Sequence, residues 1–580
     1  MKNADIAAIF YAMADILEMQ KVQWKPIAYR KAAKAIETLS QPIEEVYSKG
    51  GLKALMEIPG VGEALAQKIE QYILTGKIDS YERLKKEMPQ GLGDLIAVPG
   101  LGPKKAYRLF EELDIRSLVD LEKAAHDHRI AHLEGFGEKS EENILRSLEL
   151  VKTGQRRTPL GIALPIADEI VNRLRKVKGV IRIEAAGSLR RRMETVGDLD
   201  ILVSVKSSGD SGPVMDVFTS MPEVIQVLAK GPTKSMIVIK EGNTQIQADV
   251  RVVEDDSFGA ALQYFTGNKE HNIEMRRIAI NKGWKLSEYG IFDRNDRRIA
   301  GKTEEEVYAK LGLPWITPEL RENRGEITIA MKGKLPALVE LKDIRGDMHV
   351  HSDWSDGVNT IEEMVAAAKA RGYEYVVLSD HSGSERIANG MDGKRLLKQM
   401  EEVAKIRKKL KGITLLHGSE VSIKADGELD FSDDMLKRLD IVSVSIHSRF
   451  RSTKEEMTER ILAALDNRYV KVFNHPTGRL INERPPYEID MDKLIDVCAD
   501  RKIALEINSF PSRLDINDQY VKKTIEAGVK LTISTDSHSM DHLRFIEYGV
   551  SVARRSWCEK KDVINTMTLK ELVKYWKLTI

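Results

Sequence analysis

The chain has 580 residues and a net charge of +1, with 42% hydrophobic and 31% charged residues. At about 150 residues per domain, this length predicts three or four domains, and the composition excludes a disordered chain. Two cysteines exclude a disulfide framework and a Cys-rich zinc module, and are typical of a cytoplasmic protein. No apolar run approaches the ~18 residues that a membrane helix needs, so we expect no membrane partner.

Residues 1–85 and 86–155 have Ala, Leu, Glu and Lys at helical spacing, which predicts two all-α domains. A short pattern repeats within them: I-P-G-V-G from Ile58, V-P-G-L-G from Val98 and L-E-G-F-G from Leu133. A repeat every ~35 to 40 residues is typical of one compact helical unit per copy.

Each repeat predicts a tight turn between two helices. Glycine permits the positive φ of such a turn, and the free N–H groups of the next helix can then meet a phosphate. A plain helix–turn–helix connection is the alternative, but three copies favour binding of the DNA backbone. The repeats resemble helix-hairpin-helix motifs, with DNA-binding positions at Gly60, Gly62, Gly100 and Gly102.

Residues 156–257 predict an α+β domain, in which a helix over 163–177 precedes several alternating strands. Asp198 and Asp200 lie in G-D-L-D at the start of an apolar strand, and Asp249 lies in a second strand. Period two places each acid opposite an apolar face, so the three carboxylates converge if these strands are neighbours. Two divalent cations would resolve their repulsion, whereas exposed faces of an amphipathic sheet are the alternative interpretation.

The motif G-S-L-R-R-R from Gly187 supplies a turn, a hydroxyl and guanidinium groups suited to triphosphate oxygens. Together with G-D-L-D and the single strand aspartate, it resembles the nucleotidyltransferase palm. The motif Y-F-T-G from Tyr264, followed by His271 and Asn272, narrows the resemblance to family X DNA polymerases of the DNA polymerase beta type. This resemblance covers residues 1 to 320.

The resemblance implies that Asp198, Asp200 and Asp249 bind Mg²⁺ or Mn²⁺ and are the catalytic carboxylates. It makes residues 258–320 a subdomain that binds the nascent base pair. Lys269 departs from the pattern, because the beta-type enzyme has an acidic residue there. The implied nucleotide-binding positions are Gly187, Ser188, Arg191, Gly197, Tyr264, Phe265, Gly267, Asn272 and Arg276.

In the N-terminal domain, Lys68 matches the Schiff-base lysine of the lyase members of the family, and Lys25 and Tyr29 match contacts to a 5′-phosphate. Ala64 replaces a phosphate-binding lysine, so a solvated helix lysine is the alternative interpretation of Lys68. The family's hairpins also bind Na⁺ or K⁺ through main-chain carbonyls, here expected near Ile58, Val61, Val98 and Leu101.

Residues 321–345 are charged and contain glycine, which predicts a linker. From residue 346 to 580, strands and helices alternate at ~30-residue intervals, which predicts a parallel, barrel-like α/β domain. The expected strands are Gly346–Val350, Tyr375–Ser379, Thr414–Glu420, Ile441–Ile446, Val470–Asn474, Ala504–Asn508 and Leu531–Thr535.

Six of the twelve histidines follow or end these strands, and three carboxylates accompany them. Active sites of such barrels lie at the C-terminal rim, and imidazole with carboxylate suits Zn, Mn or Fe. Nine ligands exceed the needs of one ion, so we expect two or three ions that generate a hydroxide, with Arg479 placed to hold a phosphate. The expected ligands are His349, His351, Asp356, His381, Glu420, His447, His475, Asp536 and His538.

This pattern resembles the polymerase and histidinol phosphatase (PHP) domain, which implies a trinuclear site on a distorted seven-stranded barrel. The whole chain thus resembles the bacterial family X polymerases. The resemblance implies a monomer that fills gaps in gapped or primer-template DNA with deoxynucleoside triphosphates, in base excision repair. It also implies a 3′–5′ exonuclease, with related AP endonuclease or 3′-phosphatase activity.

Two alternatives belong to other functional classes. One is a PHP phosphoesterase with a degenerate polymerase half, and the other is a non-enzymatic DNA-binding scaffold. The complete set of palm aspartates argues against the first, and the nine metal-ligand positions argue against the second.

Overall fold

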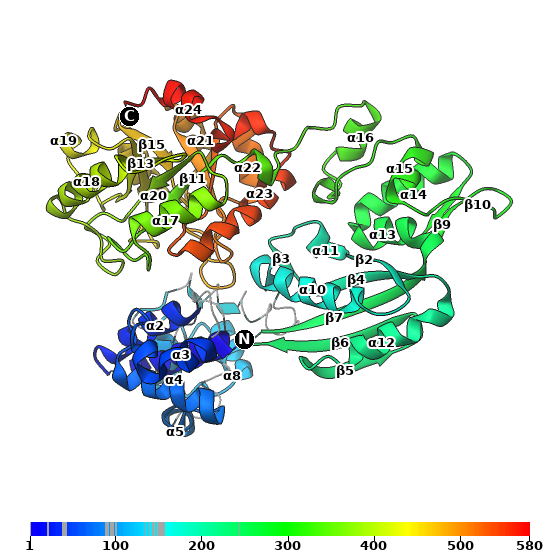
Figure 1. Cartoon of the computed structure of the whole chain (residues 1–580), viewed down its shortest axis with the longest axis horizontal. Helices are drawn as coiled ribbons and strands as arrows, with labels where there is room; N and C mark the ends of the chain where they lie inside the picture. Colours follow the sequence, from blue (N-terminus) through cyan, green and yellow to red (C-terminus); the bar gives the residue numbers. More distant parts are fainter. Residues whose placement is uncertain are drawn as a thin grey trace. The chain divides into compact units, whose positions relative to one another are not determined.

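The computed structural model (Figure 1) divides into two compact units. The first contains residues 1–156, with Glu241–Thr244 and Asn482–Arg484, and the second contains the remainder. No helix among the described residues is both long enough and apolar enough to cross a membrane. The structure describes residues 2–19, 22–37, 43–87, 92, 95, 98, 101, 103–133, 135–137, 140, 141, 144, 145, 148, 157–242 and 244–579.

The first unit is helical and contains two hydrophobic cores. One core forms between residues 6 and 78, around Phe10, Ile36 and Ile69. The second combines Ile16 with apolar residues between 92 and 148. The helices are α1 (Lys2–Met19), α2 (Lys25–Glu37), α3 (Ile43–Met56), α4 (Glu63–Thr75), α5 (Asp79–Glu87), α7 (Pro103–Leu113) and α8 (Leu118–His126).

The second unit begins with the palm, a five-stranded sheet in the order β2-β4-β7-β6-β5. Helices α10 and α12 pack on the sheet face of Leu199, Ile201 and Val203, and α13 (Phe258–Thr266) packs with Leu202 on the other face. The palm elements are β1 (Thr158–Pro159), α10 (Leu160–Arg175), β2 (Val180–Ala185), α11 (Gly187–Arg190), β3 (Thr195–Val196), β4 (Asp198–Val205), α12 (Gly212–Thr219), β5 (Val224–Lys230), β6 (Lys234–Glu241) and β7 (Thr244–Glu254).

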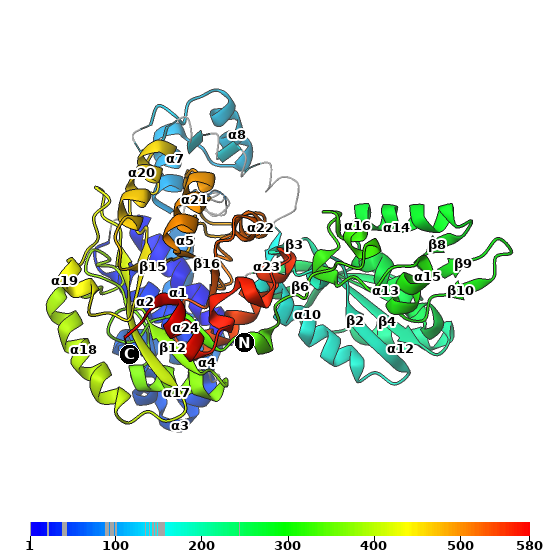
Figure 2. The ribbon, with the colours of Figure 1, turned by 90° about the horizontal axis from the view of Figure 1, so that it is seen from above.

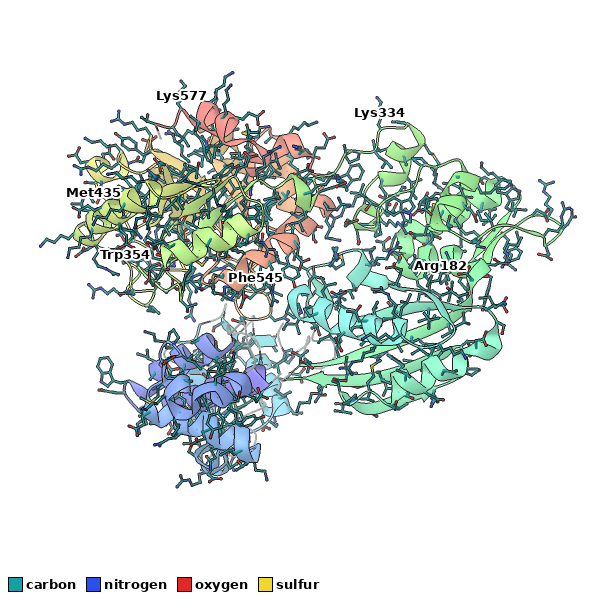
Figure 3. All side chains as sticks on the ribbon, in the orientation of Figure 1. Arg182, Lys334, Trp354, Met435, Phe545 and Lys577 are labelled. Atoms are coloured by element: carbon teal, nitrogen blue, oxygen red, sulfur yellow. The ribbon has the colours of Figure 1, made fainter. Side chains whose placement is uncertain are left out.

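A smaller subdomain follows the palm and packs around Met275, Ile291 and Val307. Arg182 of β2 (labelled in Figure 3) connects it to the sheet, because its Nη1 donates to the main-chain carbonyl of Lys302 at 2.9 Å. The subdomain contains α13, α14 (Lys269–Asn281), β8 (Lys285–Ser287), β9 (Gly290–Phe292), β10 (Arg298–Ala300) and α15 (Glu304–Leu311).

The segment 321–345, predicted to be a linker, has more structure than its composition suggests. It contains α16 (Glu326–Met331), and Arg321 at its start is fully buried. The Arg321 guanidinium lies 2.6 Å from Glu304 of α15. A charged residue in a buried ion pair adds to the polar composition of a segment as much as a solvated one does. Composition alone therefore predicted exposed chain here, although Arg321 is buried.

The C-terminal domain is a barrel of seven parallel strands in sequential order, as predicted. A bridge between Val350 and Ser537 brings the first strand beside the segment after the last. Each strand lies within two residues of its expected bounds. The strands are β11 (Gly346–Val350), β12 (Tyr375–Leu378), β13 (Thr414–Ser422), β14 (Ile441–Ser445), β15 (Val470–Phe473), β16 (Ala504–Asn508) and β17 (Leu531–Ser534).

Helices cover the outside of this barrel, as Figure 2 shows for α17 and α18. Helix α24 (Leu569–Trp576) closes the end where the strands begin, with Leu572 and Trp576 in one core with Tyr375 and Ile441. The opposite end, where the strands finish, holds the polar residues. The remaining long helices are α17 (Ile361–Ala370), α18 (Gly393–Arg407), α20 (Lys454–Leu465), α21 (Met491–Arg501), α22 (Asp518–Glu526) and α23 (Ile546–Arg555).

Candidate metal centres and DNA contacts

The three palm aspartates meet on one face of the sheet. Strands β4 and β7 are parallel neighbours, and Asp200 lies directly opposite Asp249 in their register, while Asp198 lies opposite Gln247. Side chains alternate along a strand, so the acids share the side of Leu202 and α13. The convergence that was predicted on condition of strand adjacency therefore occurs.

The palm site carries excess negative charge. Burial, together with the carboxylates of Asp198 and Asp249, raises the pKa of Asp200 to about 7. Burial and Asp249 also raise the pKa of Asp198. The Nζ atom of Lys234 lies 2.8 Å from Asp249 and balances part of this charge. Oxygen donors with uncompensated charge fit Mg²⁺ or Mn²⁺.

Gly187 lies against the palm carboxylates. Its φ is +60°, and an added Cβ would lie 2.2 Å from Asp200 Oδ2. Glycine is therefore required here both by its conformation and by the close approach. Ser188, on the same short helix α11, is half-buried, and Gly197 is exposed beside Asp198.

Arg191 follows α11 and is held by two partners. Its Nε donates to Glu322 at 2.7 Å, and its Nη1 donates to the carbonyl of Thr266. Asn268 also donates to Glu322, at 3.2 Å. The guanidinium thus lies at the junction of the palm and the following subdomain.

The remaining predicted nucleotide-binding residues lie on α13 and α14 or between them. Asn272 is buried, accepts from Gln263 and donates to the carbonyl of Tyr264, both at 2.7 Å. Phe265 lies under the Arg251 guanidinium at 4.4 Å. Gly267 has a φ of +65°, and Arg276 is half-buried one turn after Asn272.

The sequence analysis did not identify Glu304, which organises the same region. Its carboxylate binds Arg190 at 2.7 Å and the buried Arg321 at 2.6 Å. Burial would raise the pKa of Glu304, but Arg321 and Arg190 lower it to about 2. Its local sequence, T-E-E-E, reads as an ordinary helix start and contains no signal of this role.

The hairpin repeats share one turn geometry. In each repeat, the backbone N–H of the fourth residue donates to the carbonyl of the first at 3.0 Å. These bonds run from Val61 to Ile58, from Leu101 to Val98 and from Phe136 to Leu133. Gly60 has a φ of +81°. Gly62 is the N-cap of α4, and no capping side chain hydrogen-bonds the first N–H groups of the helix. The first N–H groups of α4 are therefore accessible to a phosphate. Gly100 and Gly102 lie outside the described residues.

Lys68 lies half-buried on α4, and its Nζ donates to the carbonyl of Ala64 at 3.1 Å. Partial burial and the positive charge of Lys25 lower the pKa of Lys68. The structure thus brings Lys25 and Lys68 into electrostatic contact. Tyr29 is instead largely buried, with its ring edge-on to Phe10 at 5.4 Å.

The nine predicted PHP ligands gather at the C-terminal rim of the barrel. Glu420 of β13 is fully buried at the centre, and its oxygens lie 3.0 Å from His381 and 2.7 Å from His475. His349 and His351, at the end of β11, have their Nε2 atoms 3.0 Å apart.

Three overlapping groups in this cluster have donor atoms close enough to hold a metal ion. Eight of the nine predicted ligands belong to them, and His475 joins through its contact with Glu420. The groups are His351, Asp356, His381 and His538; His349, His351 and Asp536; and His381, Glu420 and His447.

The rim charges compensate one another. Burial would lower the pKa of His349, but Glu420, Glu506 and Asp536 hold it well above its usual value. Burial would raise the pKa of Glu420, but the neighbouring histidines hold it well below. Among the described residues, His381 Nδ1 and Glu420 Oε2 are both buried and lie 3.0 Å apart, but neither makes a hydrogen bond of acceptable geometry. Buried donor atoms without hydrogen bonds fit metal ligands, and imidazole with carboxylate suits Mn, Zn or Fe.

Glu506 of β16 supports this cluster and was not identified from the sequence. It lies 2.8 Å from His349 Nδ1 and accepts from the backbone N–H of His475 at 2.7 Å. It thereby fixes the ring of His349 and the backbone of His475. An acid two residues before the end of an apolar strand, in L-E-I-N, is the signal that could have identified it.

Arg479, predicted to hold a phosphate, pairs with Glu194 of the palm at 3.0 and 2.6 Å. Its Nε donates to the carbonyl of Arg513 at 2.9 Å. Arg513 contacts a predicted metal ligand directly, with its Nε 3.3 Å from Asp536.

Family models match four parts of the chain. They are a helix-hairpin-helix domain at residues 1–78, a SAM-like helix-hairpin-helix tandem at 92–149, a DNA polymerase beta thumb at 261–322 and a PHP domain at 347–510.

Individual proteins are similar over the whole chain or over one half. The DNA polymerase/3′-5′ exonuclease PolX of Bacillus subtilis (strain 168) is 38% identical over 580 residues, all of both chains. DNA polymerase lambda of Rattus norvegicus is 24% identical over 55% of this chain and 56% of its own. A probable phosphatase of Thermoanaerobacter sp. (strain X514) is 29% identical over 40% of this chain and 96% of its own.

Proposed function

Because the chain belongs to the family X DNA polymerases that carry a PHP domain, we infer that it is both a DNA-directed DNA polymerase and a 3′–5′ exonuclease. The observation that supports polymerisation is the register of β4 and β7, which places Asp200 opposite Asp249 beside Asp198. Two divalent cations bound there would stabilise the attacking and leaving oxygens of nucleotide transfer.

Primer extension with Mg²⁺ tests this half of the proposal. The wild-type protein should extend a primer across a short gap, and Asp249→Ala should not. Ser207→Ala, in the same domain but away from the carboxylates, is the matched control. Extension by Asp249→Ala at a comparable rate would contradict the assignment.

We propose that the PHP rim binds two or three ions of Mn²⁺, Zn²⁺ or iron. The donor set supports this, because nitrogen ligands favour later transition metals over Mg²⁺. Ions bound there would supply a hydroxide at neutral pH. A 3′-labelled oligonucleotide should therefore be degraded far faster with Mn²⁺ than with Mg²⁺, and His538→Ala should abolish this. Equal activity with both metals would contradict the proposed site.

We propose gap filling in base excision repair as the cellular role, with gapped or primer-template DNA and deoxynucleoside triphosphates as substrates. The hairpins support this, because they offer backbone N–H groups to a phosphate without reading sequence. The same rim would accept other blocked 3′ ends, in AP endonuclease or 3′-phosphatase reactions. Assays on 3′-phosphate and abasic-site oligonucleotides test this extension.

Lys68 is proposed as the nucleophile of a 5′-deoxyribose-phosphate lyase. Its lowered pKa supports the proposal, because an amine must lose its proton to form an imine. We also propose Na⁺ or K⁺ at the hairpin carbonyls, a monomeric state and a cytoplasmic location. The free thiols of Cys498 and Cys558, both buried, are consistent with a reducing compartment. Sedimentation with and without DNA tests the monomeric state.

A further inference from the structure

Arg555, at the end of α23 in the PHP domain, is buried in contact with the palm. Helix α23 begins directly after Phe545, which Figure 3 labels. The Arg555 side chain is only 2% exposed. A guanidinium buried this deeply is held by specific partners, since desolvation of an unpaired charge is costly.

Two of these partners are Arg191 of the palm and Glu322, the carboxylate that holds the Arg191 side chain. Nη1 of Arg555 donates to the main-chain carbonyl of Arg191 at 3.2 Å. The same nitrogen lies 3.4 Å from Glu322 Oε1, the oxygen that accepts from Arg191 Nε at 2.7 Å. Arg555 therefore contacts Arg191 through its backbone and through the carboxylate that orients its side chain.

The other end of Arg555 is anchored inside the PHP domain. Its Nη2 donates to Asp518 of α22 at 2.6 Å, and Arg324 donates to the same oxygen at 2.8 Å. Asp518 thus fixes the guanidinium while Nη1 reaches the palm. The described contacts of Arg191 engage its Nε and Nη1, which leaves Nη2 for an oxygen of a ligand.

We propose that Arg555 is a positioning residue for nucleotide binding: the PHP domain sets the orientation of the palm arginine that receives the triphosphate. This inference rests on the proposed polymerase function. A fixed guanidinium binds phosphate with less loss of conformational freedom than a mobile one. The consequence is that a residue of the exonuclease domain affects the KM of the polymerase for nucleotides.

The test is a double-mutant cycle in gapped-primer extension with the full-length protein. Arg555→Met should raise the KM for the incoming nucleotide roughly tenfold and change kcat less. In an Arg191→Ala background, Arg555→Met should have no further effect on KM, because it acts through Arg191. A merely structural role would instead give additive losses and lower kcat.

Arg554→Met is the matched control. Arg554 neighbours Arg555 on α23, and its side chain also contacts a residue outside the PHP domain, Glu319, at 2.7 Å. It makes no described contact with Arg191 or Glu322. It should leave the nucleotide KM unchanged, and exonuclease activity should be retained in both variants. An equal rise of KM in Arg554→Met would overturn the inference.

The outcomes separate this inference from the function it rests on. If Arg191→Ala leaves the nucleotide KM unchanged, the proposed triphosphate role of Arg191 is wrong, and the inference falls with it. If Arg191→Ala raises KM, but Arg555→Met leaves KM unchanged or adds its own rise to that of Arg191→Ala, only the inference is overturned. Should Arg555→Met fail to fold, Arg555→Lys keeps a charge beside Asp518 but loses the planar fork, and its KM should still rise. An unchanged KM in Arg555→Lys would contradict the proposal.

Discussion

In the palm, three carboxylates share one face of a sheet with Lys234, whereas at the barrel rim six imidazoles alternate with three carboxylates. The palm acids are only partly compensated, and the pKa of Asp200 is raised to about 7. At the rim, carboxylates hold the pKa of His349 above its usual value and histidines hold that of Glu420 below.

This difference concerns how strongly each site depends on its metal ions. The palm site has less positive than negative charge and requires cations to complete it, which suits ions that arrive with a nucleotide. The rim is largely self-compensated and buried, which suits ions that stay bound. The two activities should therefore respond independently to mutation and to metal.

The largest expected effect tests whether the palm and the barrel rim act independently. Asp198→Ala with Asp200→Ala should lower primer extension by roughly 10³-fold or more, since metal coordination contributes several kcal/mol of transition-state stabilisation. Exonuclease activity should be retained. His349→Ala with His351→Ala should give the reverse pattern. Both assays on both variants check this, and loss of both activities in either variant would contradict independent sites.

A smaller loss is expected when the support of the rim is removed. Glu506→Gln should lower metal affinity or exonuclease activity by about 10- to 100-fold, because it frees His349 and the His475 backbone. Bound Mn²⁺ can be counted by elemental analysis after dialysis. Glu402→Gln is the control, because Glu402 accepts from Trp354 and not from a ligand. Full metal occupancy in Glu506→Gln would show that Glu506 is not needed.

A several-fold effect is expected at Lys68, the third chemical centre. If Lys25 lowers the pKa of Lys68, then Lys25→Ala should raise that pKa and reduce the deprotonated fraction near pH 7. Borohydride trapping on a 5′-deoxyribose-phosphate end should slow several-fold and recover at higher pH. Lys68→Ala should give no adduct. Lys77→Ala, an exposed lysine beyond α4, is the control, and undiminished trapping in Lys68→Ala would assign another lysine.

The last prediction concerns stability and distinguishes a buried histidine of the barrel from the ligands. Burial, with the charge of Arg407, lowers the pKa of His417 to about 3, and it bonds to Gln399 at 2.8 Å. Below pH 6.5 the unfolded chain binds a proton that the folded chain does not, so stability should fall by up to about 1.4 kcal/mol per pH unit down to pH 3.

Urea unfolding between pH 5 and 8 measures this slope. His417→Gln should flatten it, because the replacement does not titrate. The same slope in wild type and His417→Gln would assign the pH dependence to other groups.

Regular elements of the barrel could be predicted closely from the sequence. Its strands are buried on both faces, so they read as short apolar runs, and β11 and β16 match their predicted bounds. The ligands could be predicted because they follow these runs. The palm acids could be predicted for a similar reason, since strand alternation fixed their common face.

The partners that charged residues meet across long sequence separations could not be predicted. Glu506 meets His349 across 157 positions of sequence, and Glu304 meets Arg190 across 114. Arg479 meets Glu194 across 285 positions, although its motif suggested a phosphate ligand. An isolated charged residue has the same local pattern whether it is solvated or paired in the interior, so only tertiary structure assigns its partner.

The register of β4 and β7 also limits how this chain can change in length. Asp200 and Asp249 face each other across a continuous parallel ladder. Deleting one residue within β7 before Asp249 would turn its carboxylate to the side of α10, away from Asp198. Loops outside the ladder tolerate insertions, whereas inside it even a single-codon deletion would separate the acids. The spacing of the palm carboxylates therefore depends on β4 and β7 keeping their lengths and their register.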